Sequence, residues 1–142
     1  MLKLVCDKND RFEVSKIELE QERQLFTIET LRILQKQYLN YEIYFTMGSD
    51  NLKELETWKK STELVEEFKF LIIERDKDCA KDIVKNSKFL KQYKEKFIKV
   101  NTQIHSNLSS TFVRNEVKNG RSIRYLTPDE VVDYINKNKL YM

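Results

Sequence analysis

Residues 69–74 read KFLIIE, a near-continuous apolar run of strand length. Runs of this kind are typical of parallel strands that other elements cover on both faces. On either side of this run, helix-like and strand-like patterns alternate at the spacing of βα units. We therefore predict an α/β fold, in which an open, mostly parallel sheet is flanked by helices.

The periodicity of the apolar residues predicts the other elements. Strands are expected at residues 12–20, 42–47 and 96–100, and helices at residues 1–7 and 78–93. A helix with apolar positions at helical spacing is expected to begin at Thr27, after a loop at 21–26. Ser61 and Thr62 can cap another helix, because hydroxyl side chains accept from free backbone N–H groups.

Two further helices are predicted near the C-terminus. One begins around residue 110 and is expected to end near residues 118–120, since glycine, here Gly120, is a common helix terminator. The other begins at residues 127–130, which read TPDE. Thr127 is expected to be its cap, with proline at the first helical position and a glutamate three residues after the cap.

Length, charge and cysteine content limit the class of protein. A chain of 142 residues fits a single domain, residues 1–142, with one sizeable core. Its 26 basic and 23 acidic residues leave a net charge of +3, which argues against nucleic acid as a partner. No apolar run is long enough to cross a membrane or to serve as a signal peptide. Cys6 and Cys79 are expected to be free thiols rather than one disulfide, which favours a cytoplasmic protein.

Ligands of open α/β sheets bind where the carboxyl end of a strand leads into the next helix. Three segments meet this description: residues 25–30 (LFTIET), 47–51 (MGSDN) and 108–114 (LSSTFVR). The third places Ser110, Thr111 and Arg114 on one face of a helix start. Hydroxyls, free backbone amides and a guanidinium suit a phosphate, although an ordinary cap followed by a solvated arginine is the simpler interpretation.

The second segment contains Gly48, one of two glycines in the chain. Glycine at a strand end permits close approach of a ligand or a positive φ. Asp50 then either binds a ribose hydroxyl or caps the next helix. Trp58, the single tryptophan, either belongs to the core or stacks on a flat ring, since its neighbours in the sequence are charged. The single histidine, His105, is expected to be a loop residue, and no metal site is expected.

Taken together, these segments resemble the bacterial nicotinate-nucleotide adenylyltransferases, which belong to the nucleotidyltransferase superfamily and have a Rossmann-like fold. Each motif is weak alone, but their order and spacing are specific. The resemblance runs along the whole chain through Trp58 and residues 26–31 (FTIETL), 47–52 (MGSDNL), 109–114 (SSTFVR), 124–128 (RYLTP) and 139–141 (KLY).

The resemblance implies adenylyl transfer from ATP to nicotinate mononucleotide, with Mg²⁺ accompanying ATP, in NAD biosynthesis. Ser110, Thr111 and Arg114 would hold the ATP phosphates. The nicotinate nucleotide would be held by Trp58, which stacks on the ring, by backbone amides near Thr27 and Lys59, and by Gly48 and Asp50 at the floor of the site. ATP and nicotinate mononucleotide are thus the expected partners, and the sequence is compatible with a homo-oligomer.

The chain also departs from the family. The family opens with a strand, a Gly-Thr-Phe-Asp-Pro loop and a His-x-Gly-His motif that grips the ATP phosphates, and none of these occurs in this sequence. The chain corresponds to the C-terminal two-thirds of the family fold and retains no catalytic residue of that motif. We therefore expect little or no transferase activity from these 142 residues alone. The alternatives are a non-catalytic nucleotide-binding module, a gene fragment and, less favoured, an RNA-associated domain.

Overall fold

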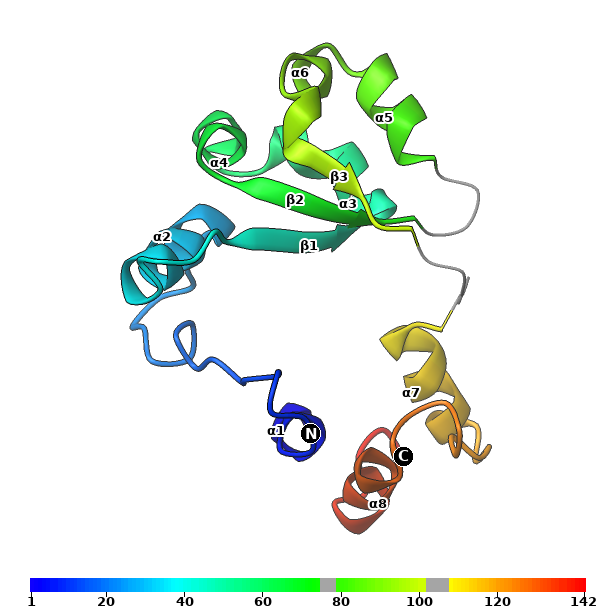
Figure 1. Cartoon of the computed structure of the whole chain (residues 1–142). Helices are drawn as coiled ribbons and strands as arrows, with labels where there is room; N and C mark the ends of the chain where they lie inside the picture. The colour runs from blue at the N-terminus through cyan, green and yellow to red at the C-terminus, as the bar shows by residue number, and fades with distance from the viewer. Residues whose placement is uncertain (75–78, 102–107) are drawn as a thin grey trace. The chain divides into compact units, whose positions relative to one another are not determined.

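The computed structural model describes residues 1–74, 79–101 and 108–142 (Figure 1). The chain separates into two compact units, one formed by Ile17–Ser106 and the other by Met1–Lys16 together with Asn107–Met142. Each unit has its own cluster of buried apolar side chains. The description of residues 1–142 as a single domain stays a prediction.

The Ile17–Ser106 unit is built on a three-stranded parallel sheet. Its strands are β1 (Tyr44–Gly48), β2 (Lys69–Ile73) and β3 (Phe97–Lys99), in the order β1-β2-β3. Phe70 of the central strand pairs in register with Phe45 on one side and Phe97 on the other. The predicted α/β class with a parallel sheet is confirmed.

The central strand is buried on one face only. Phe70 and Ile72 are fully buried, whereas Ile73 is 37% exposed and Leu71 is half-buried. The expectation of a strand covered on both faces is therefore wrong for the part of the chain that the structure describes. The sequence of this run could not show which of its faces is covered, because its residues are apolar on both faces. In the structure, the helices pack on one face only.

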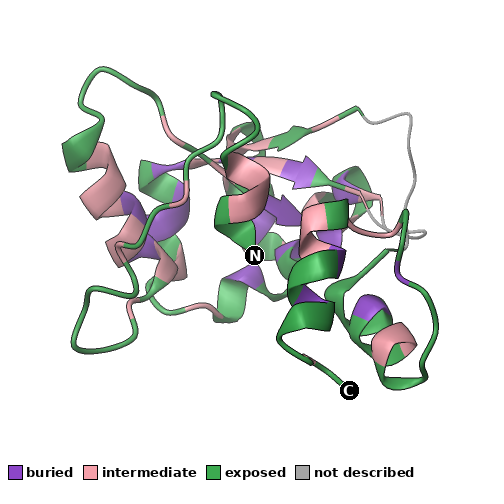
Figure 2. Ribbon diagram, turned by 90° about the horizontal axis from the view of Figure 1, so that it is seen from below, coloured by how far each residue is buried: buried purple, intermediate pink, exposed green. Residues whose placement is uncertain are grey.

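Helices surround the buried face of the sheet (Figures 1 and 2). They supply most of the core of this unit through residues such as Ile28, Leu52, Leu64 and Leu90. Their bounds are α2 (Thr27–Gln37), α3 (Ser49–Glu54), η1 (Leu55–Thr57), α4 (Ser61–Glu67), α5 (Ala80–Asn86), α6 (Lys88–Gln92) and η2 (Lys94–Lys96).

The predicted helix at 78–93 is in fact two helices within its described part. Ser87 ends α5 and begins α6, with φ −93° and ψ 127°, and its hydroxyl accepts from the backbone N–H of Leu90 at 3.1 Å. Serine competes with the helix by bonding to nearby backbone, and it favours helix starts for that reason. The periodicity of apolar residues continued across this break and concealed it.

The cap predicted for α4 is also wrong. The capping position is Lys60, in the left-handed region at φ 57°, and no side chain caps the helix. The Ser61 hydroxyl instead donates to the backbone carbonyl of Glu56 at 3.0 Å. Helix α4 is joined to α2 by Arg32, whose Nη2 and Nε donate to Glu63 and Glu67 at 2.6 and 2.8 Å.

The strand predicted at 12–20 is absent from the structure, which shows turns and irregular backbone there. Phe12 and Leu19, two of its four apolar positions, are 59% and 83% exposed. The alternation is broken between Val14 and Ile17, which lie three positions apart. A strand also needs a neighbouring strand for its backbone groups, and residues 12–20 belong to no sheet in the described part of the chain.

The other unit consists of α1 (Leu2–Cys6), α7 (Ser110–Lys118) and α8 (Asp129–Lys137), as predicted apart from small shifts in bounds. Its core is formed by Val113, Ile123, Val132 and Ile135. Lys8, just after α1, forms an ion pair with Glu130 of α8. Helix α7 ends at Lys118, within the predicted segment 118–120, and Gly120 follows with a φ of +68°. Among the described residues, no helix has the length and apolar character required to span a membrane.

Candidate functional site

The start of α7 brings together the hydrogen-bond donors that the sequence analysis expected there. Ser109 is the capping residue, and its hydroxyl accepts from the backbone N–H of Phe112 at 3.1 Å. Ser110 and Thr111 then occupy the first turn, where backbone N–H groups have no helical acceptor. The helix therefore presents amides and two hydroxyls at one end of α7.

Arg114 lies one turn further along the same helix. Its Nη2 donates to Thr111 Oγ1 at 3.1 Å, which confirms that these two side chains share a face. Ser110 and Arg114 both line a cavity of about 340 Å³ in this unit, whereas Thr111 does not line it. All three side chains are exposed. The guanidinium and the first-turn hydroxyls are thus brought together within reach of solvent.

The same cavity contains a polar residue that the sequence misassigned. Thr127 was expected to cap α8, but the capping position is Pro128 and no side chain caps that helix. Thr127 Oγ1 is buried, lines the cavity and has no hydrogen-bond partner among the described residues. The sequence Thr-Pro-Asp-Glu suggested a threonine cap, but it also fits a helix that begins one residue later. The buried position of Thr127 was missed for that reason.

In the sheet-containing unit, Gly48 and Asp50 occupy the end of β1 and the first turn of α3. Gly48 is buried and has φ −76° and ψ 158°, so its conformation is extended rather than left-handed. Asp50 is exposed and is not the cap of α3, since Gly48 holds that position. This junction places a carboxylate directly beyond the carboxyl end of a parallel strand, as expected.

Trp58 lies at the margin of the core. Its indole is half-buried and packs edge-on against Phe45, with 6.1 Å between the ring centroids. The next residue, Lys59, is exposed in a turn. The indole thus belongs in part to the core, the simpler of the two interpretations from sequence, while its remaining surface stays accessible.

Thr27 begins α2 and is half-buried. The loop before it is held by Glu29, which accepts from the backbone N–H of Phe26 at 2.9 Å. Arg23 donates to both oxygens of Glu29, at 2.9 and 2.7 Å. The Arg23 hydrogen bonds, with help from the Phe26 amide, lower the pKa of Glu29 to about 2. Sequence reasoning missed this pair, since a separation of six residues matches no helical or strand spacing.

The structure groups the candidate residues by unit. Ser110, Thr111 and Arg114 lie together on α7, and the others follow strand or helix ends in the sheet-containing unit. His105 lies outside the described residues. Within 1–74, 79–101 and 108–142, no three histidine, cysteine or acidic side chains converge as a metal site would require.

Comparisons with known proteins agree with these features. The cytidylyltransferase-like family matches residues 1–116. A probable nicotinate-nucleotide adenylyltransferase of Roseiflexus castenholzii is 36% identical over 141 residues, which are 99% of this chain and 69% of that protein. Its counterpart from Clostridium novyi is 30% identical over 99% of this chain and 70% of its own length.

Solved structures give the same result. The nicotinic acid mononucleotide adenylyltransferase of Plasmodium falciparum complexed with NaAD is 25% identical to the chain, with a TM-score of 0.65. The match covers 84% of this chain and 58% of that one, and the complex with APC gives a TM-score of 0.66 and covers 60% of its chain. The chain thus spans about three-fifths of these solved proteins. It belongs to the cytidylyltransferase-like family and, within it, to the nicotinate-nucleotide adenylyltransferases.

Proposed function

We propose that this chain supplies part of an enzyme that transfers the adenylyl group of ATP to nicotinate mononucleotide in NAD biosynthesis. The observation that carries the proposal is the start of α7, where Ser110, Thr111 and Arg114 combine hydroxyls, free amides and a guanidinium. This donor set suits the oxygens of a polyphosphate, which accept many hydrogen bonds and attract a bidentate cation. Family membership supplies the reaction.

In the proposed reaction, a phosphate oxygen of nicotinate mononucleotide attacks the α-phosphorus of ATP in line. The bond from that oxygen to the α-phosphorus forms as the bond to the β-phosphate oxygen breaks, giving nicotinate adenine dinucleotide and pyrophosphate. No covalent enzyme intermediate is required, so the protein acts by positioning and by stabilising charge. Arg114 would exchange its hydrogen bond with Thr111 for bonds to phosphate oxygens.

The sheet-containing unit would bind the nicotinate nucleotide. Asp50, beyond the end of β1, suits a sugar hydroxyl, and the buried Gly48 would lie at the floor of the site. The accessible part of the Trp58 indole would stack on the pyridine ring. Backbone amides near Thr27 and Lys59 would receive the ring carboxylate. These roles follow from family resemblance and from the placement of the residues at element ends.

The proposed cofactor is Mg²⁺ bound to ATP. The ion would be held mainly by phosphate oxygens and water, as is usual for Mg²⁺ with nucleotides. It would neutralise phosphate charge. Cys6 and Cys79 are both free, which supports a reducing compartment and hence the cytoplasm.

Calorimetry with ATP tests the role of α7. Arg114→Ala should weaken ATP binding about tenfold, because a charge-assisted bidentate contact is lost, and Arg114→Lys should recover part of it. Lys118→Ala, which removes an exposed charge from the last turn of the same helix, is the matched control. Equal effects of Arg114→Ala and Lys118→Ala would refute the assignment.

A second candidate function is nucleotide binding without catalysis. It is favoured by Asp50, Trp58 and Arg114, whose side chains are exposed or half-buried and so accessible to a nucleotide. Saturable binding of ATP or nicotinate mononucleotide without any release of pyrophosphate would support this alternative. Turnover at an enzymatic rate would exclude it.

A further inference from the structure

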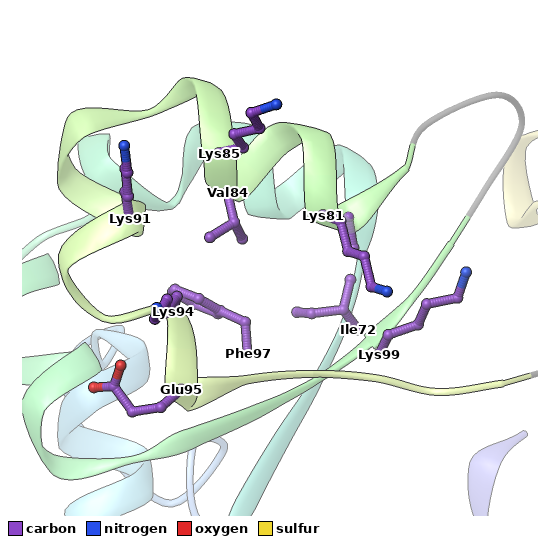
Figure 3. A pocket seen from close by; sticks show the side chains of 10 residues that line it. Ile72, Lys81, Val84, Lys85, Lys91, Lys94, Glu95, Phe97 and Lys99 are labelled. Atoms are coloured by element: carbon purple, nitrogen blue, oxygen red, sulfur yellow. The ribbon is translucent and has the colours of Figure 1, made fainter.

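A second cavity, of about 450 Å³, lies between the sheet and α5, α6 and η2. Its apolar lining comes from Ile72 of β2, Ala80 and Val84 of α5, and Phe97 of β3. Ile72, Val84 and Phe97 surround the hollow in Figure 3. The volume falls in the range of small-molecule sites. None of its residues is assigned to nucleotide binding above.

Positive charge surrounds this apolar cavity. Lys99 is held by Glu74 of the same unit, with Nζ 2.7 Å from Oε2. The other four lysines that line the cavity form no ion pair with a described residue, and Glu95 is the single acidic side chain among the described lining residues. These four are Lys81, Lys85, Lys91 and Lys94.

Lysines often extend their stems over apolar surface and keep their amines in water. Lys81 and Lys85 come from α5, while Lys91 and Lys94 come from α6 and η2. In Figure 3 the Lys81 side chain runs toward Ile72 at one end of the hollow, whereas those of Lys85 and Lys91 point outward from their helices. These lysines give the surface around the cavity a positive field, which favours an anion at its rim. An apolar group attached to that anion could fill the cavity beneath it.

We propose that this cavity binds a small organic anion with an apolar body, namely a medium-chain carboxylate. Its alkyl chain would contact Ile72, Val84 and Phe97, and its carboxylate would meet the lysine amines. A nucleotide suits the cavity less well, because the lining includes no hydroxyl or amide side chain that could read the edges of a base. The inference goes beyond the proposed transferase function and does not depend on it.

Titration of the full chain with octanoate, followed by calorimetry, tests the proposal. Octanoate should bind saturably and about tenfold more tightly than hexanoate, since each buried methylene contributes about 0.8 kcal/mol. Octan-1-ol should bind about tenfold more weakly than octanoate, because it lacks the charge. Equal binding of the alcohol and the acid, or displacement of octanoate by stoichiometric ATP, would overturn the proposal, as would no saturation at the solubility limit.

Two variants locate the site. Lys81→Ala with Lys91→Ala should weaken octanoate binding about fivefold. The matched control is Lys118→Ala with Lys137→Ala, which removes the same charge from exposed positions outside the cavity and should change binding less than twofold. Val84→Thr keeps the shape of the wall but adds a hydroxyl, and should weaken binding about threefold. Circular dichroism verifies folding, and equal effects of the two lysine pairs would contradict the proposed location.

Discussion

At the scale of single residues, several polar side chains fix the ends of helices mainly through hydrogen bonds to the backbone. Ser109 caps α7, Ser87 caps α6, and Glu29 holds the backbone N–H of Phe26. Of these, Glu29 alone carries a charge that titrates in an accessible range. Its partner Arg23 stays protonated at all relevant pH values.

The Glu29–Arg23 pair makes the loop before α2 sensitive to acid. The pKa of Glu29 is lowered to about 2 in the folded state from an ordinary value of 4.5, so its stabilising contribution is complete above about pH 4.5 and is lost as the pH falls through 2. Glu29→Gln should therefore lower the melting temperature at pH 7, and this difference should shrink between pH 4.5 and pH 2.

Thermal melts followed by circular dichroism across that range provide the measurement. Glu20→Gln is a suitable control, because Glu20 is exposed in the same unit and its side chain forms no hydrogen bond or ion pair with a described residue. A difference between wild type and Glu29→Gln that stays constant down to pH 2 would contradict the assigned pKa.

At the scale of elements, the strands and helices were predicted better than their boundaries. The run at 69–74 became the central parallel strand because its apolar character was sufficient for a buried position, and Thr27 begins α2 as its apolar spacing indicated. The split at Ser87 and the unpaired segment 12–20 were not predictable in the same way. Both depend on tertiary partners, which local periodicity does not report.

The one-sided burial of β2 predicts unequal effects of two neighbouring substitutions. Phe70→Ala should reduce the free energy of unfolding by about 3–5 kcal/mol, since a fully buried ring leaves a cavity. Leu71→Ala, on the half-buried face, should cost about 1–2 kcal/mol. Urea unfolding of both variants measures the difference. Equal losses would mean that both faces of β2 are covered.

At the scale of the whole molecule, the family assignment was predictable because it rests on the order of several weak motifs along the chain. The placement of Ser110, Thr111 and Arg114 was also predictable, since one helix start determines it. The environment of Thr127 and the Arg23–Glu29 pair was not, because both depend on contacts without a regular spacing. The roles of the candidate residues in binding stay predictions.

The number of histidines in the sequence leads to one prediction about transferase activity. The 142-residue polypeptide, given ATP, Mg²⁺ and nicotinate mononucleotide, should release little or no pyrophosphate, because its sequence has a single histidine where the family motif uses two. A coupled pyrophosphate assay measures this, with a complete family member as the positive control. A kcat of an ordinary enzyme, about 1 per second or more, would show the prediction to be wrong.

The interruption at Ser87 also determines the shape of the lysine-rich cavity. In one straight helix, Lys81 and Lys91 would lie about 15 Å apart along the axis and on different faces of the helix. Because the chain changes direction at Ser87, both side chains line the same hollow. Ser87 thus places lysines from two separate helices around one cavity, and its hydroxyl caps the second of these helices.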